Sequence, residues 1–115
     1  MGRIEVICGP MFSGKSEELL RRLKRADIAR RESRLFKPKC DNRYSTTEVA
    51  THSGGKRGCE IIEAGREEEI FKAIYHDTEI VAFDEVQFFG DYILSVIAKL
   101  VKADKRVIVA GLDMD

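Results

Sequence analysis

The stretch Gly9-Pro10-Met11-Phe12-Ser13-Gly14-Lys15-Ser16 decides how the rest of the sequence is interpreted. It satisfies the pattern Gly-x-x-x-x-Gly-Lys-Ser in full, and a chance match in a chain of this size is expected in on the order of one case in several hundred. Glycines let the backbone curl so that successive N–H groups point inward, and a following helix adds partial positive charge at the same place. The stretch therefore predicts a phosphate-binding loop.

Two side chains at the end of this loop have distinct expected roles. Lys15 supplies a full positive charge to the β- and γ-phosphates of ATP. Ser16 places a hydroxyl oxygen where Mg²⁺ needs a hard ligand. We therefore expect residues 9–16 to bind ATP, with Lys15 taking part in catalysis and Ser16 binding the metal.

The segments on either side of the loop supply the context that the motif requires. Residues 3–8 are largely apolar and predict a strand that Gly9 and Pro10 must end. Residues 15 to about 33 are strong helix formers. Three leucines gather on one face of this helix and basic residues fall mostly on the other, so the helix is amphipathic: the leucines are Leu19, Leu20 and Leu23, and the basic residues are Arg21, Arg22, Lys24 and Arg25.

Short apolar segments then alternate with a helical pattern. Residues 34–37, 79–84 and 106–111 predict strands, and residues 93–100 carry apolar side chains at helical spacing. Such alternation implies a parallel sheet covered by helices on both faces and joined by right-handed crossovers. We predict an α/β fold of the P-loop NTPase type, with one domain over residues 1–115. Residues 39–58 interrupt the pattern as a long polar segment without clear periodicity, which is typical of a functional or disordered loop.

The strand ending at residue 84 carries two adjacent carboxylates, Asp84 and Glu85. Ligands of parallel sheets bind at the carboxyl ends of the strands, where the phosphate loop also lies. Asp84 and Ser16 are therefore expected to share one magnesium site, with Asp84 acting through water. Consecutive side chains at a strand end point to opposite sides, so we assign Glu85 a separate role as general base. The alternative for these two residues is a solvated acidic turn without a functional role.

Composition narrows the class of protein. Hydrophobic residues at 43% and charged residues at 35% describe an ordinary globular chain, and 20 basic residues balanced by 20 acidic ones leave no net field to attract nucleic acid or a membrane surface. No segment approaches the roughly 18 apolar residues of a membrane span, and the N-terminus leaves no room for a signal peptide, so we expect a cytoplasmic protein.

Three cysteines, Cys8, Cys40 and Cys59, fit neither a disulfide framework nor a zinc site, because they are odd in number and widely spaced. We expect reduced thiols, and for Cys8, inside an apolar strand, a buried structural position.

A phosphate loop followed by Asp-Glu is compatible with a kinase, a helicase-like ATPase or a nucleotide switch. The switch is disfavoured because Asp84 is not followed by the pattern x-x-Gly and no Asn-Lys-x-Asp guanine reader is present. The helicase-like ATPase is supported only by the basic helix face, which acidic neighbours explain better as a solvated surface. A P-loop module that binds ATP without phosphoryl transfer to a nucleoside stays open.

Five motifs, in order, resemble those of the thymidine kinases of the cellular and bacterial type. They are residues 9–16, Asp41-Asn42-Arg43-Tyr44-Ser45, Thr51-His52-Ser53-Gly54, Asp84-Glu85-Val86-Gln87-Phe88-Phe89 and Ala110-Gly111-Leu112-Asp113. The resemblance implies transfer of the ATP γ-phosphoryl group to the 5′-hydroxyl of thymidine, a salvage reaction that makes a DNA precursor. It also implies feedback inhibition by dTTP and a homotetramer.

The resemblance also implies roles for individual residues. Glu85 matches the family's catalytic position, Arg43 matches an arginine near the phosphates, and Asp41 matches an acidic position in the same motif. Val86 and Gln87 belong to the motif that we include among the ATP-binding residues. Met11, Phe88 and Leu112 match positions that line the thymine pocket, and apolar walls suit a methylated base. From the residues alone, Arg43 would be an exposed loop residue, and the alternative for Phe88, Phe89 and Leu112 is a place in the core.

Members of this family continue beyond the last motif into a segment with four zinc-binding cysteines and a loop that closes over the nucleoside. That zinc site is expected only in such a segment, because the cysteines of this sequence lie elsewhere. Without the segment we expect the phosphate site to survive and thymidine affinity and water exclusion to be weakened.

Overall fold

The computed structural model describes residues 2–9, 14–39, 48–50, 56–63 and 65–112. Five parallel strands form one sheet in the order β1-β7-β6-β2-β5, and two short strands, β3 and β4, form an antiparallel pair. The predicted α/β class and parallel sheet are confirmed. In chain order the elements are β1 (Arg3–Gly9), α1 (Lys15–Ile28), β2 (Ser33–Pro38), β3 (Glu48–Ala50), β4 (Lys56–Gly58), β5 (Glu60–Ile62), α2 (Glu67–Lys72), β6 (Ile80–Phe83), the short 3₁₀ helix η1 (Val86–Phe88), α3 (Tyr92–Lys102) and β7 (Arg106–Leu112).

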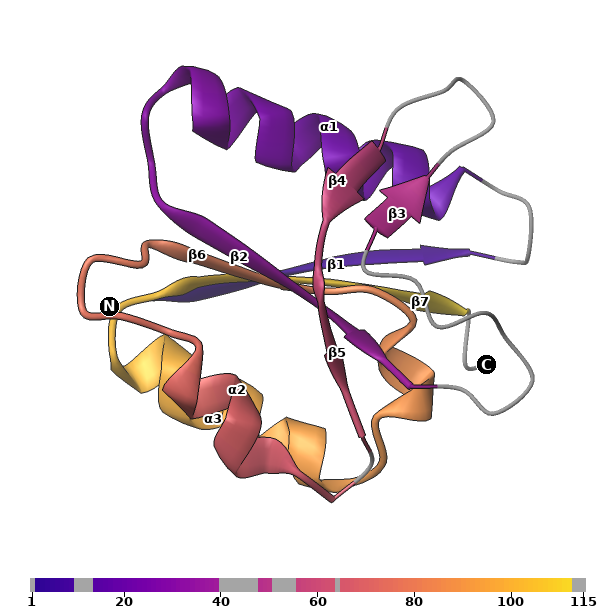
Figure 1. Cartoon of the computed structure of the whole chain (residues 1–115), viewed down its shortest axis with the longest axis vertical. Helices are drawn as coiled ribbons and strands as arrows, with labels where there is room; N and C mark the ends of the chain where they lie inside the picture. The colour runs from indigo at the N-terminus through magenta and orange to yellow at the C-terminus, as the bar shows by residue number, and fades with distance from the viewer. Residues whose placement is uncertain (1, 10–13, 40–47, 51–55, 64, 113–115) are drawn as a thin grey trace.

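The helices cover the sheet on both faces, as Figure 1 shows: α1 lies on one side and α2 and α3 lie on the other. Side chains alternate between the two faces along each strand. On β6, Ile80 and Ala82 pack with the α1 face, whereas Val81 and Phe83 pack with the α3 face. Strand β6 is therefore buried on both sides, which explains its continuous apolar sequence.

Helix α1 is shorter than the sequence predicts. It ends at Ile28 rather than near residue 33. Arg30 adopts a left-handed conformation (φ 59°), and the N–H of Arg31 donates to the carbonyl oxygen of Ala26 at 2.9 Å. This turn closes the helix and directs the chain into β2, so a tertiary connection overrides helix propensity.

The polar segment before residue 59 also differs from the expectation in part. Within its described residues, β3 and β4 pair with Val49 opposite Arg57, and β3 lies against α1. Two elements that the sequence did not predict, β5 and α2, follow it. Both are short, with three and six residues, and so carry too little periodicity to be recognised.

The prediction that Cys8 is buried is wrong: Cys8 is exposed. It lies on β1, the edge strand of the sheet, whose residues Ile4 and Val6 are also 49% and 61% exposed. Ile7, the inward neighbour of Cys8, packs with the α1 face. The apolar sequence of β1 therefore indicates a strand but not burial on both of its faces. Cys59 is partly buried and packs against the cluster beneath α1.

A carboxylate on β1 connects three elements at the amino-terminal half of the sheet. Glu5 accepts a hydrogen bond from Nη2 of Arg106 on β7 at 2.9 Å and forms an ion pair with Nη1 of Arg22 on α1 at 3.0 Å. Arg3 lies within 3.1 Å of the same carboxylate. The hydrogen bond from Arg106, followed by the charges of Arg106, Arg3 and Arg22, lowers the pKa of Glu5 below its ordinary value. Part of the predicted basic face of α1 is thus used in ion pairs, as Arg21 and Arg22 also contact Glu18.

Replacing Glu5 by glutamine is expected to lower the free energy of unfolding by about 1 to 2 kcal/mol at neutral pH, because charge-assisted hydrogen bonds from Arg22 and Arg106 and the ion pair with Arg3 are lost. A lowered pKa stabilises the fold above the unfolded-state value, near 4.5, and this stabilisation is lost as the pH falls through the folded-state value. The difference between the two proteins in urea unfolding should therefore shrink below pH 4.5. Glu79→Gln is the matched control, because its ion pair with Arg31 is exposed and should contribute less than about 0.5 kcal/mol. Equal effects of the two substitutions would contradict the role of Glu5.

Candidate functional site

The carboxyl ends of the strands and the start of α1 meet at one edge of the sheet, on the right in Figure 1. The parallel register aligns Gly9 at the end of β1 with Leu112 at the end of β7, and Phe83 at the end of β6 with Val109 on β7. β7 thus lies between the strand that leads into the phosphate loop and the strand that leads into the two carboxylates. The carboxyl ends of these three strands therefore lie at the same edge of the sheet.

The structure brings Ser16 and Asp84 together, as the sequence predicts. The hydroxyl of Ser16, in the first turn of α1, donates to Oδ2 of Asp84 at 3.4 Å across 68 positions of sequence. Asp84 continues the alternation of Ile80 and Ala82 and therefore lies on the α1 face of the sheet. Its N–H also extends the sheet by donating to the carbonyl oxygen of Phe36 at 2.9 Å.

Asp84 is a carboxylate in a buried position, only 5% exposed. Burial, followed by the neighbouring charge of Glu85, raises its pKa above the ordinary value of 3.8. The N–H of Glu85, which donates to Oδ1 at 3.0 Å, acts in the opposite direction, as do the charge of Lys37 and the hydroxyl of Ser16. A buried acidic group that lies beside another carboxylate and costs stability is typical of a functional site.

Ser16 and Asp84 have the donor chemistry that magnesium requires. A hydroxyl and a carboxylate are both hard oxygen ligands, and the 3.4 Å separation of their oxygens is long for a hydrogen bond. Within the described ranges, no group of three or more His, Cys, Asp or Glu side chains could hold a metal ion. The residues present therefore fit Mg²⁺ only if phosphate oxygens and water complete its coordination, as is usual for this ion.

Glu85 follows Asp84 in a left-handed backbone conformation, with φ 52° and ψ 47°. This conformation is unfavourable for a residue with a side chain, and such strain is concentrated at functional sites. The side chain is partly buried, and its Oε2 atom is shielded from solvent. The structure thus holds Glu85 in a defined place, and its role as general base stays a prediction.

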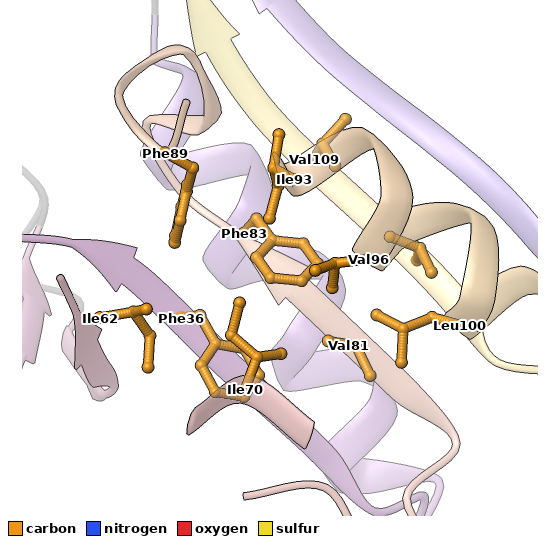
Figure 2. Packing of buried hydrophobic residues seen from close by; sticks show 11 residues of the cluster. Phe36, Ile62, Ile70, Val81, Phe83, Phe89, Ile93, Val96, Leu100 and Val109 are labelled. Atoms are coloured by element: carbon orange, nitrogen blue, oxygen red, sulfur yellow. The ribbon is translucent and has the colours of Figure 1, made fainter. Parts of the chain in front are cut away.

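The short helix η1 is fixed by Phe89, the residue directly after it. Phe89 is fully buried and packs edge-to-face against Phe83 with ring centroids 5.6 Å apart, while Phe83 stacks on Phe36 at the same distance. Figure 2 shows Phe83 at the centre of this cluster, between the sheet and α3. Glu85 is therefore held between two buried aromatic anchors, one before it and one after it.

Gly111 on β7 allows η1 to lie close to the sheet. A Cβ atom at this position would lie 2.6 Å from Oε1 of Gln87 and 2.9 Å from Cγ1 of Val86. Val86 also packs against the core cluster beneath α3. The contacts of Val86 and Gln87 are thus with the protein interior, and their predicted part in ATP binding stays a prediction.

Phe88 differs from its neighbour in the sequence. It is 47% exposed, whereas Phe89 is fully buried. The core alternative considered for these two residues therefore holds for Phe89 and not for Phe88. An exposed aromatic ring three residues after Glu85 is accessible to a ligand, and its contact with a thymine base stays a prediction.

Several predicted residues lie outside what the structure describes. These are Pro10, Met11, Phe12 and Ser13 of the phosphate loop, Asp41 and Arg43 of the polar segment, and the side chain of Leu112. Of the remaining loop residues, Gly14 adopts a left-handed conformation (φ 81°) directly before α1, which only glycine adopts without strain. Lys15 is the first residue of α1 and is partly buried, so its side chain begins at the same edge as Asp84.

One charged neighbour of Asp84, Lys37, was not predicted from the sequence. It precedes Pro38 at the end of β2 and belongs to no motif that we recognised. The register that pairs Phe36 with Phe83 places Lys37 beside Asp84. Only strand pairing reveals this neighbour, because the two residues are far apart in the sequence.

Asp84→Asn should stabilise the nucleotide-free protein by on the order of 1 kcal/mol at neutral pH, because a buried charge with a raised pKa is removed. A carboxylate whose pKa is raised by folding destabilises the folded state when it is ionised. This loss of folding free energy disappears below the unfolded-state pKa near 3.8. The same variant should lose the magnesium dependence of nucleotide binding. Urea unfolding and calorimetry with and without Mg²⁺ measure the two effects, and a destabilised variant that retains magnesium dependence would contradict both.

Gly111→Ala should lower the free energy of unfolding by about 1 to 3 kcal/mol and displace η1, since the new methyl group overlaps Gln87 and Val86. Adding Gln87→Ala removes the nearest of these atoms and should restore part of the loss in a thermal unfolding experiment. If Gly111→Ala alone is as stable as the unmodified chain, the close packing of η1 on β7 is not a real constraint.

None of the helices in the described ranges is long and apolar enough to cross a membrane.

Comparison with known protein families adds an independent finding. The family model for thymidine kinase matches residues 2–115, which is nearly the whole chain and includes both the phosphate loop and the paired carboxylates. The chain belongs to the thymidine kinase family.

Proposed function

We propose that the protein transfers the γ-phosphoryl group of ATP to the 5′-hydroxyl of thymidine, giving dTMP and ADP. The observation that carries the proposal is the contact of Ser16 with the buried carboxylate of Asp84 beside Glu85. It joins the end of the phosphate-loop motif to a pair of oxygen ligands suited to magnesium, beside a candidate base. Membership of the thymidine kinase family supports thymidine as the acceptor.

The residues of the site have separate roles in the proposed reaction. Backbone N–H groups of the loop and Lys15 bind the phosphates, while Ser16 directly and Asp84 through water would hold Mg²⁺. Bound magnesium would neutralise charge that develops on the phosphate oxygens.

Glu85 accepts the proton of the 5′-hydroxyl as the bond from that oxygen to the γ-phosphorus forms. The bond from the γ-phosphorus to the bridging oxygen breaks, and ADP leaves with the electron pair. Arg43 would stabilise the charge on the transferred group, and Asp41 would support it.

Recognition of thymine would use the exposed ring of Phe88 together with Met11 and Leu112. Apolar side chains reject an unmethylated base only weakly, because one methyl group contributes about 1 to 3 kcal/mol. Feedback inhibition by dTTP and a homotetrameric assembly are further parts of the proposal that rest on family membership alone.

Glu85→Gln should reduce the turnover number by about 10²- to 10⁴-fold, because a general base is lost while the shape of the side chain is kept. The affinity for ATP and Mg²⁺ should stay within about twofold. Thymidine-dependent formation of ADP, measured alongside calorimetric nucleotide binding, checks both expectations.

The matched control is Glu79→Gln, which removes an exposed carboxylate before β6 and should leave turnover unchanged. ADP formation that does not depend on thymidine, or nucleotide binding without any turnover, would favour an ATPase or a binding module. Retention of turnover in Glu85→Gln would remove Glu85 from the mechanism.

A further inference from the structure

Lys37 lies at the carboxyl end of β2, at the same edge of the sheet as Asp84. Along β2, Leu35 packs with the α1 face and Phe36 with the α3 face. Alternation therefore places Lys37 on the α1 face, which is also the face of Ser16 and Asp84. Since Phe36 pairs with Phe83, the next position pairs Lys37 with Asp84 on the neighbouring strand, roughly 4.8 Å away between backbones.

The interaction of Lys37 with Asp84 is electrostatic. Among the described residues, the hydrogen bonds to the Asp84 oxygens come from Ser16 and from the N–H of Glu85. Lys37 acts on this carboxylate through its charge, in the direction opposite to burial and to Glu85. The charge of Lys37 therefore acts on the carboxylate without a hydrogen bond between the two side chains.

The acidic charges at this edge of the sheet favour the binding of a cation there. Asp84 and Glu85 place two acidic groups side by side, one of them buried, at the position where a triphosphate would add more negative charge. Lys15, at the start of α1, is the only cation that the phosphate-loop motif itself provides. A lysine ammonium is a compact charge that binds phosphate oxygens well.

We propose that Lys37 is a second basic residue of the phosphoryl-transfer site, and that its ammonium contacts the γ-phosphoryl group of ATP from the β2 side. The inference rests on the proposed function and adds a residue to it. Lys15 approaches the phosphates from the start of α1, so the two lysines flank the transferred group. Lys37 stabilises negative charge on that group and moves no proton.

The test compares nucleotides that differ in the γ-phosphate. Lys37→Met removes the charge and keeps most of the apolar stem. It should weaken binding of the non-hydrolysable analogue AMP-PNP by about tenfold and leave ADP binding within twofold, because only AMP-PNP has a γ-phosphate. Turnover with thymidine should fall by about 10²-fold, as expected when a preorganised charge is removed from a transition state. Lys37→Arg, which keeps the charge, should recover a measurable part of both losses.

Lys39→Met is the matched control. Lys39 is two residues further along the chain, and its exposed ammonium pairs with Glu63 at 3.1 Å. This variant should bind AMP-PNP and ADP like the unmodified chain. Circular dichroism melting of every variant identifies any loss of folding, which would weaken both nucleotides together.

The outcomes separate the two proposals. Equal weakening of AMP-PNP and ADP in Lys37→Met, or no weakening of either, would overturn the role of Lys37 and leave the kinase proposal intact. Selective loss of AMP-PNP in a protein without thymidine-dependent turnover would support Lys37 and overturn thymidine as the acceptor. If the unmodified chain binds no nucleotide, both proposals fail.

Discussion

The alternation of side chains along β6, which is buried on both faces, is the constraint on which the site depends. Because Ile80 and Ala82 must pack beneath α1, Asp84 is placed on that same face, where the hydroxyl of Ser16 reaches it. A shift of β6 by one residue would exchange the side chains packed beneath α1 with those packed beneath α3 and would turn the carboxylate away from α1. The apolar core therefore sets the position of the polar site, and the two cannot vary independently.

A second constraint acts on the segment after Asp84. Phe89 is drawn into the core against Phe83, while Gly111 leaves room for the chain between them. Glu85 lies within this short connection in a backbone conformation that a residue with a side chain rarely adopts. Burial of the aromatic rings stabilises the fold enough to hold this strained residue, and this explains how a local cost is tolerated beside the phosphate loop.

Much of the fold and part of the site could be predicted from the sequence. The alternation of apolar strands with helical patterns gave the parallel α/β sheet, and the phosphate loop followed by Asp84 predicted the contact with Ser16. Short elements such as β5 and α2 could not be predicted, because three or six residues carry too little periodicity. The exposure of Cys8 depends on the place of β1 at the edge of the sheet, and the proximity of Lys37 to Asp84 depends on strand register. Neither is encoded in a local pattern.

The distance along the chain between Ser16 and Asp84 links nucleotide binding to folding. Their contact spans 68 positions and requires β6 and β2 to be paired and α1 to be docked, so no short segment can form the site alone. An unfolded chain would have almost no affinity for the nucleotide. Binding would therefore favour the native state as a whole, by about 2.7 kcal/mol at a free concentration one hundred times the Kd. In a cell rich in ATP, bound nucleotide would stabilise the folded protein. Depletion of nucleotide would then lower the abundance of the protein as well as its activity.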